Sequence, residues 1–217
     1  MGLFSQLSYI SRKRKLGLFN KIIKPTSKMK VLDVGAEINP HGNSGLQFID
    51  TYPWRSRVTA INISVEHIKL VKEYYPEIQA VAGDACNLPW PNKYFDAVYS
   101  NAVIEHVGDF ENQRKMAAEI MRVGKRWFVA TPNRWYPYEF HLRLPFVTWL
   151  PEHGYLWAGS IINYNHARQK YMFSMKKPSG IRLMTAKELE RCFPGSKIIK
   201  QRVTFMAETL IAIGGDI

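Results

Sequence analysis

From residue 29 onward, the sequence alternates short apolar runs with segments of helical periodicity. The first run, residues 29–35 (MKVLDVG), is apolar up to an aspartate and a glycine, which is typical of a strand buried on both faces. A second run, residues 57–63, is rich in β-branched residues and leads into an amphipathic segment that Ser64 can cap. Strands that alternate with helices favour a mostly parallel sheet with helices on both faces.

The alternation continues along the chain, with further apolar runs at residues 78–83, 95–101 and 126–132. The last two runs, residues 197–205 and 206–214, follow one another with almost no connection, which predicts an antiparallel strand pair. The sequence therefore predicts an α/β fold: a Rossmann-like, doubly wound, seven-stranded and mostly parallel sheet with an antiparallel C-terminal strand.

Length and composition fit one such domain over residues 29–217. A chain of 217 residues with 46% apolar and 22% charged residues is typical of a soluble globular protein with one sizeable core. Its apolar runs fall well short of the roughly 20 residues that cross a bilayer. Cys86 and Cys192 show no metal-ligand spacing, and one pair is too little for a disulfide framework, so we expect free thiols in the cytoplasm.

Residues 1–28 form a basic extension of different character. Residues 1–30 hold eight Lys and Arg and no acidic residue, so they account for eight of the twelve net positive charges. Apolar residues interleave with these cations, which predicts an amphipathic helix. Such a helix either packs its apolar face on the domain, or contacts an acidic partner or the inner surface of the membrane.

Small and polar residues follow the predicted strands at the edge where doubly wound sheets bind ligands. These positions suit a polar cofactor that lies across several strand ends, because small residues allow close backbone approach and polar residues accept hydrogen bonds from hydroxyl, amino and ammonium groups. The residues are Asp33, Gly35, Ala36 and Glu37 after the first strand, Asn62 and Ile63 after the second, Asp84 and Ala85 after the third, and Ser100 and Asn101 at the end of the fourth.

Four motifs in this order resemble the class I S-adenosylmethionine (SAM)-dependent methyltransferases that act on small molecules and lipids. They are VLDVG (31–35), INIS (61–64), GDACNLPW (83–90) and FDAVYSNAVIEHV (95–107). The resemblance covers residues 29–135 and the order of the later elements. It implies SAM as the cofactor and S-adenosylhomocysteine as its product.

The resemblance also implies a role for each strand end. Gly35 and Ala36 would lie against the methionine part of SAM, and Asp33 would help to bind its ammonium group. Asp84 and the backbone of Ala85 would accept hydrogen bonds from the adenine amino group. Ser100 and Asn101 would border the sulfonium, and Asn62, next to Ile63, stands where members of the family carry an acidic ribose ligand.

The loop after the first strand departs from the family pattern. Glu37 and Asn39 replace the usual glycines, and an asparagine at 62 lacks the charge that makes an acceptor about twice as strong. The segment AEINPHGNSG predicts a long irregular loop, followed by a short helix over residues 45–50. Glu37 either points into the site as a substitute carboxylate or is solvated.

Residues 132–180 form an insertion after the fifth strand. Its 49 residues hold 11 of the 28 aromatic residues in the chain, so we expect it to fold as a lid or pocket wall. Its aromatic side chains either pack against the sheet or line a substrate pocket. The first part, residues 131–151, also resembles a segment of bacterial members associated with envelope polysaccharide or lipid biosynthesis.

Methyl transfer from a sulfonium is an in-line displacement, so the protein has to align the acceptor and remove its proton. The candidate bases are Glu105 and His106 after the fourth strand and His141 in the insertion, each of which could instead be structural or orient the substrate. His153 and His166 also lie in the insertion. The histidines lack the paired short spacing of metal sites, so no metal is expected.

The predicted function is SAM-dependent methylation of a hydroxyl or amine on a small-molecule, lipid or glycan acceptor. The basic extension suggests an RNA methyltransferase as an alternative, but the fourth strand ends in SNAV where enzymes acting on exocyclic base amines usually show NPPY. The missing glycines suggest a second alternative, a catalytically inactive SAM-fold binding protein. A dehydrogenase is disfavoured because G-x-G-x-x-G is absent.

Overall fold

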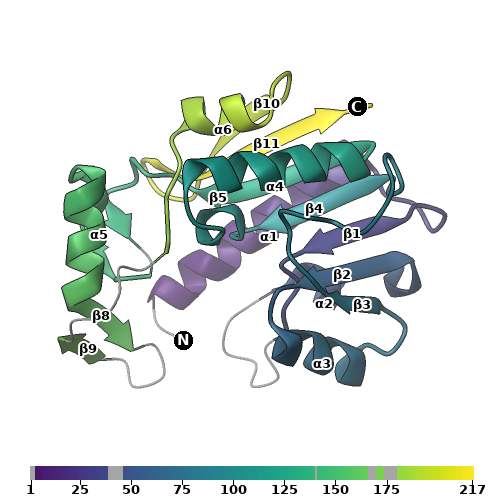
Figure 1. The fold of residues 1–217 in the computed structure, drawn as a ribbon, viewed down its shortest axis with the longest axis horizontal. Coiled ribbons are helices and arrows are strands. Elements are labelled where there is room, and N and C mark those ends of the chain that lie inside the picture. Colours follow the sequence, from purple (N-terminus) through teal and green to yellow (C-terminus); the bar gives the residue numbers. More distant parts are fainter. Residues whose placement is uncertain (1–2, 39–45, 140, 166–169, 174–179) are drawn as a thin grey trace.

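The computed structural model describes residues 3–38, 46–139, 141–165, 170–173 and 180–217. A seven-stranded sheet with the order β10-β11-β5-β4-β1-β2-β3 organises these residues (Figure 1). Its strands are β1 (Val31–Val34), β2 (Val58–Asn62), β3 (Gln79–Ala82), β4 (Ala97–Asn101), β5 (Arg126–Pro132), β10 (Lys197–Arg202) and β11 (Ala207–Gly215). Strands β1 to β5 are parallel, whereas β11 is antiparallel to both β5 and β10. The structure thus confirms the predicted sheet and its antiparallel C-terminal strand.

The central strand β1 is buried along its whole length, as its apolar sequence predicts. It pairs with β2 on one side and with β4 on the other, so Asp33 lies level with Ala60 and with Tyr99. The chain order reverses between β1 and β4, which is where doubly wound sheets open a crevice at their carboxyl ends.

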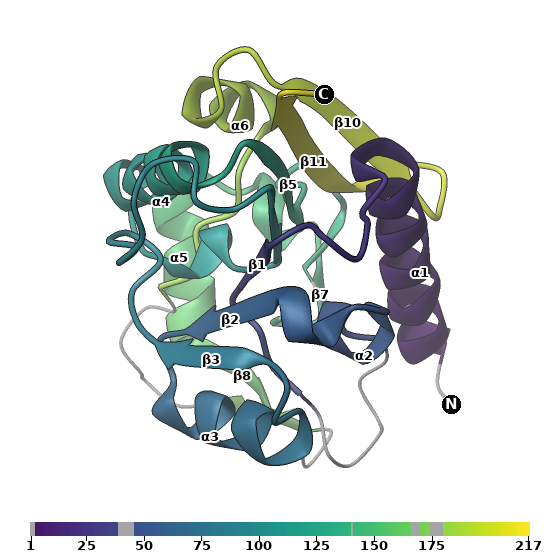
Figure 2. The same cartoon turned by 90° about the vertical axis from the view of Figure 1, so that its right-hand side faces the viewer.

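Helices cover both faces of the sheet (Figure 2). One face carries α1 (Leu3–Ile23), α2 (Phe48–Thr51) and α3 (Val65–Tyr74), and the other carries α4 (Phe110–Val123) and α6 (Ala186–Cys192). The predicted cap at Ser64 is present, and Asp109 and Thr185 also act as caps: the three side chains accept hydrogen bonds from backbone N–H groups at the starts of α3, α4 and α6. The short helix expected over residues 45–50 begins three residues later, at Phe48.

The basic N-terminal helix α1 packs its apolar side into the main core. Phe19 and Ile23 are fully buried, and Leu16 is nearly so. The ring of Phe19 lies 5.3 Å from Phe48 and 5.4 Å from Tyr99, in edge-to-face contacts that stabilise beyond area burial. None of the helices that the structure describes combines the length and apolar character needed to cross a membrane.

The insertion folds into small elements beside the main sheet. They are β6 (Tyr138–Glu139), β7 (Leu144–Pro145), η3 (Val147–Trp149), α5 (Glu152–Ile161), β8 (Ile162–Asn165) and β9 (Lys170–Phe173). Leu142, Val147 and Tyr155 form a small core of their own with Leu183. Other aromatic side chains stay exposed, among them Trp157 at 66%. Figure 1 shows α5 and β8 on the side of the molecule toward which β1 and β2 point.

Candidate active site

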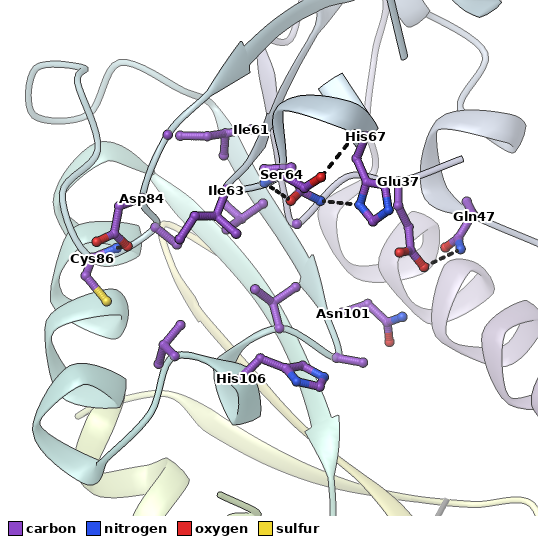
Figure 3. Close-up of a pocket in the computed structure, with 18 of the residues that line it drawn as sticks. Glu37, Gln47, Ile61, Ile63, Ser64, His67, Asp84, Cys86, Asn101 and His106 are labelled. Carbon is purple, nitrogen blue, oxygen red and sulfur yellow. Dashed lines mark hydrogen bonds between the residues drawn. The ribbon is translucent and has the colours of Figure 1, made fainter. Parts of the chain in front are cut away.

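A cavity of about 660 Å³ opens at the carboxyl ends of β1 to β4 (Figure 3). This volume is within the range of small-molecule sites. The predicted residues that line it are Gly35, Glu37, Asn62, Ile63, Asp84, Ala85 and Asn101. Figure 3 shows Asp84 on one side of the cavity, Glu37 and Gln47 on the other, and His106 at the bottom of the view. Residues from four strand ends therefore face one space.

The remaining predicted cofactor residues lie elsewhere. Asp33 and Ala36 line a second cavity of about 20 Å³, large enough for one water, which shares Gly35 and Asn101 with the main cavity. Ser100 is fully buried and lines neither cavity, because neighbouring side chains of a strand point to opposite faces. Asn39 and His166 lie outside the described residues.

The turn after β1 depends on Gly35. Its φ is +82°, and a Cβ atom at this position would lie 2.1 Å from Cγ2 of Val103. The backbone N–H groups of Gly35 and Ala36 both donate to the carbonyl oxygen of Ile61, at 2.8 and 3.2 Å. These contacts hold the turn against the end of β2, so that backbone rather than side chain faces the cavity.

The Asn62 amide connects this turn to the start of α3. Its Nδ2 donates to the carbonyl oxygen of Ala36 at 2.9 Å, and its Oδ1 accepts from the backbone N–H of Ser64 at 2.9 Å. One lone pair of Oδ1 remains for a ligand hydroxyl. The exposed Glu37, from the loop that departs from the family pattern, lines the cavity and accepts a hydrogen bond from Gln47 at 3.1 Å.

The carboxyl group of Asp33 is buried near other acidic groups. Burial, followed by the charges of Glu37 and Asp50, raises its pKa to about 8. A ligand cation in the adjoining space would favour the ionised form of Asp33.

Lys15 of α1 also reaches this region, although no pattern in the sequence indicates it. Its side chain is buried, and its Nζ donates to Oδ1 of Asn101 at 2.6 Å. Burial, followed by the charge of Arg12, lowers the pKa of Lys15 to about 8. Arg12 itself lines the main cavity. The basic extension therefore contributes side chains to the site.

Three predicted catalytic residues gather at one end of the cavity. His106 and His141 both line it, with ring centroids 5.1 Å apart and planes at 84°. Glu105 does not line the cavity and is fully buried, with Oε2 accepting a hydrogen bond from Thr131 at 3.0 Å. One ligand atom from each of the three residues lies within 4.8 Å of the others.

Glu139 of the insertion holds His141 in place. Its Oε1 lies 2.7 Å from Nδ1 of His141, and its other oxygen accepts from the backbone N–H of Leu142. Burial alone would lower the pKa of His141, but the hydrogen bond with Glu139 and the charges of Glu139 and Glu105 outweigh burial and raise it. Desolvation by the cavity walls, with the nearby His141, lowers the pKa of His106. Burial raises the pKa of Glu105.

Sequence reasoning missed several residues of the cavity wall. The sequence indicates Ser64 only as a helix cap, but Ser64 lines the cavity as well. His67, one turn later on α3, lines the cavity too. Cys86 and Asn112 line the cavity near Asp84. The position of Cys86, two residues after Asp84 in the same loop, could have indicated that Cys86 lines the cavity. Asn112 lies on α4, and only the tertiary fold shows that it reaches the cavity.

Comparison with known proteins supports a methyltransferase. Residues 41–127 match the family model of a methyltransferase domain. Over 100 residues the chain is 32% identical to a demethylmenaquinone methyltransferase from Renibacterium salmoninarum; the match spans 44% of this chain and 37% of that relative. The insertion at residues 132–180 lies outside the part that the family model matches.

Solved structures share the fold over most of the chain. A protein from Pyrococcus horikoshii OT3 superposes with a TM-score of 0.59 at 17% identity, covering 94% of this chain and 89% of that one. A SAM-dependent methyltransferase from Methanosarcina mazei gives a TM-score of 0.56 at 16% identity, covering 87% and 92%. At these identities the likeness concerns the fold alone.

The cavity also fits the cofactor of that family, since its volume suits a nucleoside with an amino-acid tail, and acceptors from four strand ends face it. Residues 41–127 thus carry the match to a methyltransferase domain, and the sheet order and the cavity fit a class I SAM-dependent methyltransferase.

Proposed function

We propose that this protein transfers the methyl group of SAM to a hydroxyl or amine of a small-molecule, lipid or glycan acceptor. One observation carries the proposal: a single cavity joins the strand-end residues Gly35, Asn62 and Asp84 to the histidines His106 and His141. A cofactor site and a group able to handle an acceptor proton therefore share one space.

We infer the orientation of the cofactor from the residues at the strand ends. Asp84 would accept a hydrogen bond from the adenine amino group, and the free lone pair of Asn62 Oδ1 would accept one from a ribose hydroxyl. Gly35 leaves room for the amino-acid tail, whose ammonium would lie toward Asp33. The exposed side chain of Ile63 would cover one face of the adenine ring.

At the end of the cavity that holds His106 and His141, the protein aligns the acceptor and removes its proton. SAM supplies an electrophilic methyl group whose bond to sulfur breaks as the new bond to the acceptor oxygen or nitrogen forms, leaving the electron pair on sulfur. Glu139 contacts Nδ1 of His141 and so orients its ring, and both His141 and His106 line the cavity in which the acceptor would bind. We assign handling of the acceptor proton to the group of Glu105, His106 and His141.

Two observations support a small-molecule acceptor. The relative from R. salmoninarum is named as a demethylmenaquinone methyltransferase, so its name gives a small molecule rather than a nucleic acid as the acceptor. The insertion that borders the cavity through His141 also carries the exposed aromatic side chains of Trp135, Phe146 and Trp157. Aromatic surfaces of this kind suit apolar or ring-shaped substrates.

Calorimetry with SAM and S-adenosylhomocysteine tests the cofactor half of the proposal. We expect one site with micromolar affinity, weakened about tenfold or more in Asp84→Ala, since the adenine amino group loses its hydrogen-bond acceptor. Glu73→Ala, an exposed carboxylate at the far end of α3, is the matched control and should bind as the wild type does. No binding at millimolar cofactor would reject the proposal.

Transfer of a labelled methyl group tests the acceptor half. Purified protein would be incubated with labelled SAM and, separately, with lipid, polar small-molecule and RNA fractions. We expect label in the lipid or small-molecule fraction. Label in RNA alone would instead support an RNA methyltransferase, and cofactor binding without transfer to any fraction would support an inactive binding protein.

A further inference from the structure

We propose that Glu105, His106 and His141 bind one divalent transition-metal ion, of the kind typified by Zn²⁺, at the acceptor end of the cavity. Metal binding itself does not depend on the proposed function. The role given to the ion below does rest on it.

The donor set is the first argument. Two imidazoles and one carboxylate form a common set for Zn²⁺ and for other first-row divalent ions, and such sites keep open positions for water or substrate. The three donor atoms lie within 4.8 Å of one another, whereas donors around bound Zn²⁺ lie about 3.3 Å apart. His106 is exposed and lines the cavity, so a rotation of its side chain can close this difference while Glu139 keeps His141 in place.

An unpartnered buried oxygen is the second and independent argument. Glu105 is fully buried, and its Oε1 has no hydrogen-bond partner among the described residues, although Oε2 accepts from Thr131. A buried carboxylate oxygen without a partner is costly, and buried charges are usually paired or coordinate metals. An ion held between Oε1 and the two imidazoles would supply the missing partner.

The surroundings of these donors are the third argument. Histidine ligands usually give their second ring nitrogen to a carboxylate, and Glu139 occupies that position 2.7 Å from Nδ1 of His141. Thr131 plays the same part for Glu105. Lys15, the nearby cation, donates to Asn101 and leaves Oε1 of Glu105 unoccupied.

The ion would complete the proposed methyl transfer. An acceptor hydroxyl bound at an open position loses its proton more easily, because the ion stabilises the alkoxide that forms. The proton leaves to solvent through the open cavity. The alkoxide oxygen then forms its bond to the methyl carbon while the carbon–sulfur bond breaks, so His106 and His141 act as ligands rather than as bases.

Titration with Co²⁺ tests the site directly, because its absorption bands report ligand number and geometry. The full chain without a histidine tag is titrated in parallel by calorimetry. We expect one ion per chain in the wild type and at least about tenfold weaker binding in His106→Asn, His141→Asn and Glu105→Gln. His153→Asn, which changes an exposed histidine of α5, is the matched control and should leave binding unchanged. Glu139→Gln should weaken binding by about 10- to 100-fold.

Three outcomes would overturn the proposal. They are no Co²⁺ binding at millimolar concentration, binding that His106→Asn and His141→Asn leave unchanged, and equal weakening by His153→Asn. Both histidine variants change side chains that reach the cavity, so they test the site even if Glu105→Gln fails to fold. SAM calorimetry on the same samples separates the two proposals: cofactor binding without Co²⁺ binding rejects the metal site alone.

Discussion

The Nζ atom of Lys15, on the N-terminal helix, lies 2.6 Å from Oδ1 of Asn101, at the carboxyl end of β4. The sequence sets residues 1–28 apart as a basic extension, yet the fold brings Lys15 from this segment to the edge of the proposed methyl-transfer site. Apolar residues of the same helix anchor it, since Phe19 and Ile23 are fully buried. We therefore treat α1 as part of the site.

Substituting Lys15 should change how stability depends on pH. The pKa of Lys15 is about 8 in the folded protein and 10.5 in the unfolded chain. Between these pH values the unfolded chain binds more protons than the folded protein. The folded state therefore becomes more stable as the pH rises from 8 toward 10.5. The free energy of unfolding of the wild type, relative to Lys15→Met, should rise by up to about 2 kcal/mol between pH 7 and 9.5. Urea denaturation at both pH values measures the difference.

Lys21→Met is the control for this prediction, because Lys21 is an exposed lysine on the same helix. Its free energy of unfolding, relative to the wild type, should stay within about 0.5 kcal/mol across the same range. If the difference in the free energy of unfolding between the wild type and Lys15→Met is equally independent of pH, Lys15 is solvated.

Asp33 should make cofactor affinity depend on pH. Its pKa of about 8 means that the free protein holds the proton below that pH, whereas the ammonium of SAM binds the ionised form. Affinity for SAM should therefore rise by about tenfold or more between pH 6 and 7.5 and should be weaker and nearly flat in Asp33→Asn. Calorimetry at several pH values checks this, with Asp96→Asn, directly before the amino end of β4, as the control that keeps the slope.

Asp33→Asn should also stabilise the cofactor-free protein. Because the folded pKa of Asp33 is raised above its unfolded value of 3.8, ionisation costs stability progressively as the pH rises from about 4 to 8. Asp33→Asn should thus melt at a higher temperature than the wild type at pH 8 and show little gain at pH 4. An equal gain at both pH values would point to a cause other than ionisation.

Gly35→Ala should destabilise the fold and weaken cofactor binding. The added Cβ meets Cγ2 of Val103 at 2.1 Å, and the φ of +82° disfavours any residue with a side chain. We expect a loss of about 2–4 kcal/mol in the free energy of unfolding, measured with urea.

Two further variants separate clash from strain at this turn. Gly35→Ala combined with Val103→Ala removes the clash but not the backbone strain, so only part of the stability should return. Gly17→Ala adds its methyl group in open space on α1 and should stabilise slightly, by about 0.5–1 kcal/mol. Full recovery of the stability in the double variant would show that backbone strain at residue 35 does not contribute to the loss.

Phe19→Ala should cost about 3–5 kcal/mol of stability, because it empties a fully buried aromatic site in contact with Phe48 and Tyr99. Thermal and urea unfolding measure the loss, and Tyr9→Ala, at an exposed position of α1, should cost less than about 1 kcal/mol. A small loss for Phe19→Ala would mean that α1 is only loosely attached.

The sequence sufficed for the sheet and for much of the cofactor side of the cavity. Continuous apolar runs, helix caps and strand-end polar residues are local signals, and they led to Gly35, Asn62, Asp84 and Asn101. Ser100 could have been set aside from the same information, since it adjoins Asn101 in a strand and must face the other way.

The acceptor side could not be predicted in this way. Lys15 sits among cations that are mostly solvated, and only tertiary packing shows that it is buried. The approach of Glu139 and His141 to His106 depends on the path of the insertion, which has no periodic pattern to reveal it. Sequence spacing does not show the proximity of His106 and His141 for the same reason, since His141 comes 35 residues after His106 in the chain.

A crystal structure with S-adenosylhomocysteine bound tests the central claim most directly. The account predicts the adenine beside Asp84, a ribose hydroxyl within hydrogen-bond distance of Asn62, the amino-acid tail against Gly35, and the sulfur directed toward Asn101 and the histidines. A ligand bound elsewhere, or bound with its adenine at the histidine end, would contradict it.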